Sequence, residues 1–270
     1  MPSPILVGVD PERSSAEQVA LGSVLARAFG APLLLVSVYL NNQMTSSPLM
    51  RKVARDQAET ALQTAAEGTQ GDEVAVRAIG AHSPAAGLYD VAVATETRML
   101  VVGSTHRGPV GRVVLGAVTD NLFSGAPCAV ALAPRDVVVG AIQRIGVAFE
   151  DTLEGHAALL EAGAVAADTG AGLEAWSVVS QGEDAEERTR RAQAALTKAL
   201  AGAGADAKSH VQEGDPASVL TSASASLDAL VCGSRGYGPI TAVLLGSVTR
   251  SLAQQAQCAL IVVPHAVSAG

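Results

Sequence analysis

Two stretches of this chain decide its fold, because each is a copy of the other. Residues 103–134 read GSTHRGPVGRVVLGAVTDNLFSGAPCAVALAP, and residues 233–264 read GSRGYGPITAVLLGSVTRSLAQQAQCALIVVP. The two align without gaps at an offset of 130 residues, and 14 of the 32 positions are identical. Residues 5–10 (ILVGVD) likewise resemble residues 145–150 (IGVAFE) at an offset of 140. A repeat of this length is a whole domain, so the 270 residues contain two copies of one domain.

The boundary between the copies is predicted just after Pro134, in the short stretch 135–143. We therefore expect a first domain over residues 1–138 and a second over residues 139–270. The change of offset from 140 to 130 means that the first copy carries ten extra residues. Most of them fall in the Ser-, Pro- and Asn-rich stretch 41–50.

Each copy alternates apolar runs with amphipathic stretches, which predicts an α/β fold with a parallel, doubly wound sheet. The predicted strands are 5–9, 33–38, 74–78, 100–102 and 129–133, then 145–149, 173–179, 208–212, 229–232 and 259–263. The predicted helices are 15–29, 49–66, 84–97 and 113–123, then 153–167, 185–201, 216–226 and 243–254. The third strand of each copy is the most polar, so we expect it at an edge of the sheet.

Composition excludes several classes of protein. Hydrophobic residues make up 49% of the chain and charged residues 16%, which is too apolar for a disordered chain. The best apolar run, residues 31–40, falls short of the ~18 residues of a membrane span, so no membrane partner is expected. Asp10 comes too early for a signal peptide and three cysteines make no disulfide framework, so we expect a cytoplasmic protein. The net charge of −8 argues against a nucleic-acid partner.

A glycine-rich loop follows the fourth predicted strand of the second copy. It reads GSRGYGP over residues 233–239, and a helix is expected at Gly246 and Ser247. Glycines let backbone N–H groups approach an anion, and a helix start adds free amides and the positive end of the helix dipole. The pattern indicates phosphate binding.

Glycines after a strand also form simple turns, so a single loop of this kind is ambiguous. Here the loop recurs at the same place in both copies, which favours binding. It is not a Walker A loop, because GxxxxGK[ST] is absent, and it is not the dinucleotide fingerprint, which follows the first strand.

These residues resemble the universal stress protein family, whose nucleotide-binding members carry G-x2-G-x9-G-[ST] after the fourth strand. The second copy has the whole pattern at Gly233, Gly236, Gly246 and Ser247. The resemblance covers essentially the whole chain, as a tandem two-domain member. It implies two Rossmann-like (HUP-type) domains, each a five-stranded parallel sheet with helices on both faces. It also implies ATP or AMP at the strand ends, with Mg2+ as an optional companion.

The resemblance further implies pairing of the two domains through their fifth strands, as a pseudo-dimer within one chain. A homodimer of whole chains remains open, and the sequence names no protein partner. By position, Glu150 and Val178 would lie beside adenine and ribose, with the four motif residues on the phosphates. The other residues implied for this pocket are Ser234, Arg235, Gly238 and Val248. Glu150 stands where the family usually has Asp.

The first copy departs from the pattern. Asp10 and Val38 keep the adenine side, and the glycines that remain are Gly103, Gly108 and Gly116. His106 replaces the second motif glycine, and Ala117 replaces the motif serine, which removes a hydrogen bond worth roughly 0.5–1.5 kcal/mol. We therefore expect the second copy to bind ATP and the first to bind it weakly or not at all.

Other chemistry is less well supported. Cys128 and Cys258 are equivalent and suit packing, and Cys232 has no evident neighbouring base. The histidines show no metal-ligand spacing; His106 alone lies in a motif, His82 in a turn, and the others are expected at the surface. We expect no metal site, no catalytic residue and no dedicated enzyme. Two alternatives stay open: a scaffold in which the glycine loops are relics, and an adenylate-forming or transferase enzyme on a similar sheet.

The asymmetry between copies can be tested by titrating ATP into Gly246→Ala and Gly116→Ala variants. Trp176, two residues before Val178, provides the fluorescence signal. Gly246→Ala is expected to weaken binding, because it adds a methyl group where backbone approaches phosphate. Gly116→Ala is expected to change little, and equal losses in the two variants would refute the asymmetry.

Overall fold

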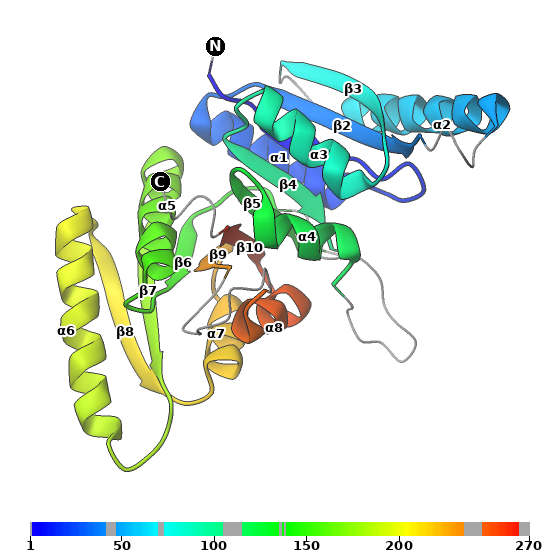
Figure 1. Cartoon of the computed structure of the whole chain (residues 1–270). Coiled ribbons are helices and arrows are strands. Elements are labelled where there is room, and N and C mark those ends of the chain that lie inside the picture. Colours follow the sequence, from blue (N-terminus) through cyan, green and yellow to red (C-terminus); the bar gives the residue numbers. More distant parts are fainter. Residues whose placement is uncertain are drawn as a thin grey trace.

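The computed structural model describes residues 2–41, 47–69, 73–104, 115–134, 137, 139–234 and 245–264. Its ten strands form one sheet in the order β3-β2-β1-β4-β5-β10-β9-β6-β7-β8 (Figure 1). The strands are β1 (Ile5–Gly8), β2 (Leu33–Leu40), β3 (Val74–Ala81), β4 (Met99–Gly103), β5 (Ala129–Ala133), β6 (Arg144–Ala148), β7 (Gly172–Val179), β8 (Ala207–Glu213), β9 (Ala229–Gly233) and β10 (Ala259–Val263).

Within each half all strand pairs are parallel, and the two halves meet through an antiparallel pair, β5 with β10. The helices are α1 (Ala16–Phe29), α2 (Pro48–Glu67), α3 (Pro84–Ala94), α4 (Ala117–Gly125), α5 (Leu153–Thr169), α6 (Ala185–Ala203), α7 (Pro216–Ser224) and α8 (Ser247–Gln255). This architecture confirms the predicted fold class. The edge positions of β3 and β8 are also confirmed.

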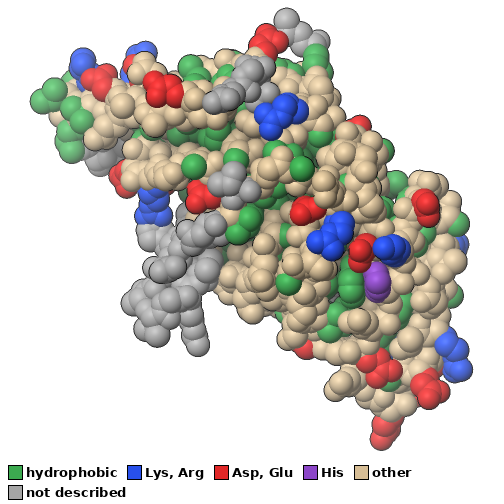
Figure 2. Space-filling model, turned by 180° about the vertical axis from the view of Figure 1, so that it is seen from behind, with side chains coloured by type: hydrophobic (Ala, Val, Ile, Leu, Met, Phe, Trp, Pro, Cys, Tyr) green, Lys and Arg blue, Asp and Glu red, His purple; other side chains and the backbone are tan. Residues whose placement is uncertain are grey.

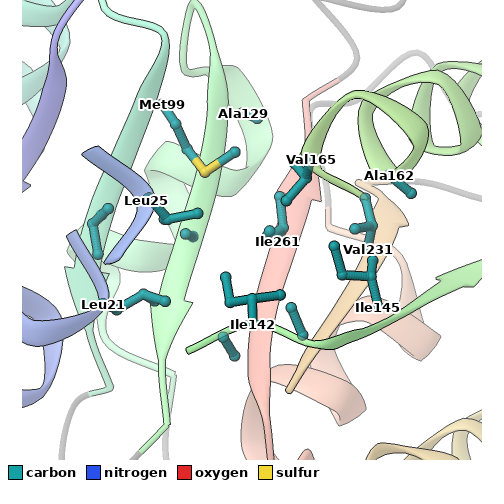
Figure 3. Close-up of a cluster of buried hydrophobic side chains, with 14 of the residues drawn as sticks. Leu21, Leu25, Met99, Ala129, Ile142, Ile145, Ala162, Val165, Val231 and Ile261 are labelled. Atoms are coloured by element: carbon teal, nitrogen blue, oxygen red, sulfur yellow. The ribbon is translucent and has the colours of Figure 1, made fainter. Parts of the chain in front are cut away.

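Helices cover both faces of the sheet and bury two hydrophobic clusters. Side chains of α1, α2, α5 and α6 contribute to one cluster, and side chains of α3, α4, α7 and α8 contribute to the other. Figure 3 shows the first cluster where the halves meet, with Leu21 and Leu25 of α1 on one side and Ala162 and Val165 of α5 on the other. Ile142, just before β6, fills the space between them. Each cluster is therefore shared by both halves.

Local capping explains where several helices begin. The side chains of Ser47, Ser83, Thr152 and Asp215 each accept a hydrogen bond from a backbone N–H in the first turn of α2, α3, α5 and α7. Three of these helices also open with proline, whose fixed φ suits the first helical position. These starts agree closely with the sequence prediction.

The apolar pattern placed the starts of the fourth helices too early, whereas the helix start expected at Gly246 and Ser247 from the glycine-rich loop is confirmed by α8. Helices were expected from Val113 and Val243, but residues 105–114 and 235–244 lie outside the described part of the chain. The described helices begin at Ala117 and Ser247. The preceding glycines have extended backbone, with ψ of 151° at Gly116 and 149° at Gly246, so the helix cannot include them.

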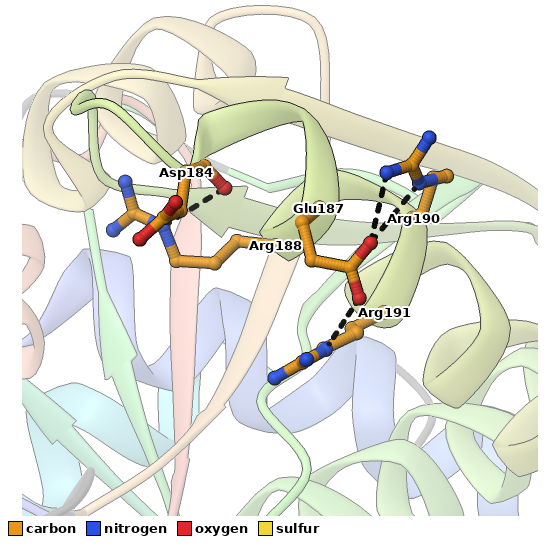
Figure 4. A network of polar contacts seen from close by, with 5 residues as sticks. All are labelled: Asp184, Glu187, Arg188, Arg190 and Arg191. Atoms are coloured by element: carbon orange, nitrogen blue, oxygen red, sulfur yellow. Dashed lines mark hydrogen bonds and ion pairs between the residues drawn. The ribbon is translucent and has the colours of Figure 1, made fainter.

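Helix α6 presents a charged surface. The carboxylate of Glu187 accepts hydrogen bonds from Arg190 Nη2 at 2.9 Å and Arg191 Nε at 2.9 Å, one turn further along (Figure 4). These bonds hold the pKa of Glu187 below its ordinary value. Figure 2 shows acidic and basic side chains interspersed over one face of the molecule. Within the described ranges, no helix has the length and apolar composition needed to cross a bilayer.

Substitution of two helical glycines by alanine is expected to change stability in opposite directions. A Cβ added at Gly22 of α1 would lie 2.4 Å from Cγ2 of the buried Val7, whereas one added at Gly163 of α5 meets nothing within 4 Å. We expect Gly22→Ala to lower the free energy of unfolding by about 1–3 kcal/mol through overpacking. Gly163→Ala should raise it by up to about 1 kcal/mol through helix propensity. Urea denaturation measures both, and equal effects would contradict the packing described.

Candidate functional site

A cavity of about 810 Å³ opens at the carboxyl ends of β1, β2 and β4 in the first half. In open parallel sheets, ligands bind at the carboxyl ends of the strands. Three of the residues singled out from the sequence line it together: Asp10, Val38 and Gly103. They come from three different strand ends, so the tertiary fold, not their spacing along the chain, brings them together.

The lining of the cavity contains both apolar and charged residues. Its apolar lining residues are Val9, Pro11, Val36, Val38, Leu40, Ala54, Pro84, Leu88, Val102 and Val118. The charged residues of the lining are Asp10, Glu12, Glu17 and Arg13. The described lining therefore carries three carboxylates and one guanidinium. Such a lining suits a ligand with both apolar and polar parts.

The carboxylate of Asp10 is held by its own loop. Its Oδ1 accepts a hydrogen bond from the backbone N–H of Glu12 at 2.9 Å, and its Oδ2 lies 3.8 Å from Arg13 Nε. The backbone N–H of Asp10 donates to Ser15 Oγ at 3.2 Å. The loop thus orients the carboxylate before any ligand arrives, which lowers the ordering cost of binding.

Gln18 of α1 also lines the cavity, although no sequence motif pointed to it. It is only 5% exposed, and a Cβ at Gly103 would lie 2.8 Å from its Oε1. The sequence reasoning also missed the buried Thr119 of α4. A signal was available: Thr119 and Thr249 are identical in the two copies, and Thr249 Oγ1 donates to the carbonyl of Gly233 at 2.9 Å. In the second copy this threonine ties a fourth-strand end to the following helix.

The starts of α4 and α8 leave backbone amides free of side-chain caps. Neither Gly116 nor Gly246 at the N-cap provides a capping hydrogen bond. The backbone N–H of Gly246 donates to the carbonyl of Ser234 at 2.8 Å, which fixes α8 against the end of β9. Ser234 is 1% exposed, and its Oγ has no hydrogen-bond partner in the described part of the chain. Uncapped helix starts of this kind attract anions.

The second half has a different connection between its first strand and first helix. By the 140-residue offset α5 starts three residues earlier than α1, at Leu153 rather than His156. A Cβ added at Gly155 would lie 1.9 Å from the carbonyl oxygen of Glu150, so only glycine fits this tight turn. A Cβ added at Gly233 would lie 2.8 Å from Cβ of Glu154. The first turn of α5 therefore packs against the end of β9, where the first half has a longer loop.

The remaining predicted site residues lie at the expected ends of elements. Glu150 is exposed just after β6, Val178 is half-buried near the end of β7, and Gly233 ends β9. Ser247 is exposed at the first position of α8, followed by the half-buried Val248. The predicted residues that lie outside the described ranges are Gly108, Arg235, Gly236 and Gly238, together with His106. Their roles remain predictions.

Trp176 has a closer neighbour than the sequence indicated. It stacks on His210 of the adjacent strand, with ring centroids 4.0 Å apart and an interplanar angle of 13°. Glu174 Oε2 lies 3.2 Å from His210 Nε2. His210, which the sequence placed at the surface, lies on the edge strand β8 with 32% of its side chain exposed. Trp176 fluorescence will therefore report on His210 as well as on nearby ligands.

The part of the chain that the structure describes contains no cluster of side chains able to bind a metal ion. Nowhere in the described ranges do three or more His, Cys, Asp or Glu side chains lie close enough to share a metal ion. His156, which the sequence placed at the surface, is paired with Asp151 at 2.9 Å. That contact stabilises the loop before α5.

Comparison with known proteins agrees with the tandem arrangement. The sequence model of the universal stress protein family matches residues 1–134 and again residues 141–264. A universal stress protein of Mycobacterium tuberculosis (strain ATCC 25618 / H37Rv) is 29% identical over 285 residues, which cover 96% of each chain. One from Mycolicibacterium smegmatis is 28% identical over 287 residues, again covering 96% of each.

A solved structure shows the same fold along the whole chain. The crystal structure of a universal stress protein from Archaeoglobus fulgidus DSM 4304 matches with a TM-score of 0.74 at 18% identity. The match covers 96% of this chain and 98% of that one. A putative universal stress protein from Pseudomonas aeruginosa UCBPP-PA14 gives 0.72 at 16% identity, covering 98% and 95%.

The three cysteines are predicted to be unreactive in the folded protein. Cys128, Cys232 and Cys258 are free and buried, and burial raises the pKa of each thiol to about 12. At pH 8 almost none is thiolate, the reactive form. Ellman's reagent should therefore label no thiol in the native protein at pH 8 and three after unfolding in guanidinium. Rapid native labelling of any cysteine would show that the burial is incomplete.

Proposed function

Since the chain belongs to the universal stress protein family, with one family domain in each half, we propose that it binds an adenine nucleotide at the carboxyl edges of its sheet. We propose further that it acts as a nucleotide-dependent regulatory protein in stress response, with at most slow ATP hydrolysis. Binding would then change the surface that the protein presents to its partners. Phosphoryl transfer would not be its main activity.

The observation that carries the proposal is the cavity of the first half. Asp10, Val38 and Gly103, picked from the sequence for the adenine side and the glycine loop, line one space of about 810 Å³. The apolar lining residues would contact the adenine ring. Apolar side chains commonly line small-molecule sites. The preset carboxylate of Asp10 would accept hydrogen bonds from the ribose or base.

Phosphate contacts would come from the helix that follows the fourth strand. In both halves this helix starts without a side-chain cap, so its first amides can donate to an anion. In the second half Ser247 adds a hydroxyl at the first helical position, where the first half has Ala117. The second half therefore offers the better phosphate site.

The described groups that line the cavity support the proposal of slow hydrolysis. Rapid phosphoryl transfer relies on positioned cations and a residue that activates the attacking oxygen. Arg13 is the one cation among the described residues that line the cavity, and it lies 3.8 Å from Asp10. We therefore expect a turnover below about one per second, the low end for enzymes.

The experiment that tests the proposal is mass spectrometry of nucleotide retained by the purified native protein, with calorimetric titration of ATP and AMP. Bound or titratable adenine nucleotide would support it. A well-folded sample that retains none and binds none would overturn it and favour the scaffold alternative. A turnover well above one per second would instead favour the enzyme alternative.

A matched pair of variants locates the first-half site. Asp10→Asn keeps the shape but removes the charge, and should weaken the already weaker adenine-nucleotide binding of the first half about 10- to 100-fold, as expected for a hydrogen bond to a charged group. Asp184→Asn, in the exposed turn before α6, is the control and should leave binding unchanged. Equal affinities for both variants would show that Asp10 does not contact the ligand.

A further inference from the structure

The two halves meet about a pseudo-twofold axis whose position can be read from the strand register. In the antiparallel pair β5·β10, Leu132 lies opposite Leu260, Ala131 opposite Ile261, and Val130 opposite Val262. At the 130-residue offset of the repeat, Ala131 and Ile261 are equivalent positions. Because equivalent residues face each other only at the axis, the axis passes through this pair.

The pair at the axis differs in size. Ala131 and Ile261 are both 0% exposed and belong to the same hydrophobic cluster. If β5 paired with β5 of another copy, the axis would hold Ala against Ala, and if β10 paired with β10, it would hold Ile against Ile. The flanking pairs would keep their total volume, since each would become one Leu with one Val. The difference in fit is therefore concentrated at the axis.

A second pair at equivalent positions differs in charge. Asp120 of α4 and Arg250 of α8 are also 130 residues apart, and Arg250 Nη2 lies 3.0 Å from Asp120 Oδ1. These helices cover the face of the sheet opposite to the Ala131 and Ile261 side chains. Pairing of like halves would put Asp against Asp, or Arg against Arg.

A third contact between the halves would also be lost if like halves paired. Arg98, just before β4, donates from Nη1 to Glu161 Oε1 of α5 at 2.8 Å. By the repeat, Arg98 corresponds to Asp228 and Glu161 to Leu21. Two second halves would bring Glu161 to Asp228, and two first halves would bring Arg98 to Leu21. Neither arrangement restores the ion pair.

We infer that the fifth-strand surface of each half is specific for the other half of the same chain, and that it disfavours the like half of a second copy. The side-chain sizes of Ala131 and Ile261 and the opposite charges of Asp120 and Arg250 both favour pairing of a first half with a second half. Repulsive alternatives of this kind are a recognised source of specificity. The inference does not depend on nucleotide binding.

The test is a charge-swap cycle in the full-length chain, measured by urea denaturation. Asp120→Arg and Arg250→Asp each create the like-charge contact of a like-half pair, and each should lower the unfolding midpoint. The double variant Asp120→Arg/Arg250→Asp should recover most of the summed loss. The single-variant losses should also shrink when salt is raised from 0.05 M to 1 M, because salt screens exposed charges.

Alanine variants separate lost attraction from repulsion. Asp120→Ala and Arg250→Ala should lower the midpoint less than the matching reversals. A double swap whose loss equals the sum of the single losses would overturn the inference for the charged pair. Both side chains are partly exposed, at 36% and 42%, so these variants are expected to fold.

The pair at the axis provides an independent cycle. Ala131→Ile and Ile261→Ala should each lower the midpoint, by overpacking and by a cavity, and the double exchange should be more stable than their sum predicts. Additive losses would show that size at the axis does not select the partner.

Discussion

The antiparallel pairing of β5 with β10 is the contact on which the rest of the architecture depends. It joins two five-stranded parallel sheets into one ten-stranded sheet, so neither fifth strand is left as an exposed edge. It also lets each hydrophobic cluster extend across both halves. Separating the halves would expose strand edges and apolar side chains together.

This pairing fixes where the two candidate sites lie. Strands within a half are parallel, and the strands of one half run antiparallel to those of the other. The carboxyl ends of the strands in the two halves therefore point in opposite directions. The described residues that line the first-half cavity all come from the first half, while the interface is shared. One site can change without disturbing the other, which agrees with the loop before α1 and the early start of α5.

Much of the fold could be predicted from the sequence, because the repeat and the apolar periodicity are local signals. The starts of α3, α5, α6 and α7 matched their predictions, since prolines or caps mark most of them. The apolar pattern placed the starts of α4 and α8 too early, because apolar residues before Gly116 and Gly246 imitate a helix, whereas the glycine motif marked the start of α8 correctly. Of the site, the glycines and Asp10 could be found by motif. Gln18 could not, since nothing in a single helix shows that its amide meets Gly103.

The sequence by itself determined that the chain is a tandem α/β protein with a glycine loop after each fourth strand. Those features are encoded in residues close together along the chain. Only the tertiary structure decided the register that sets Ala131 against Ile261, and the packing of Glu154 on Gly233 that makes the two halves unequal. These contacts join residues far apart in sequence, and their geometry depends on how whole elements pack.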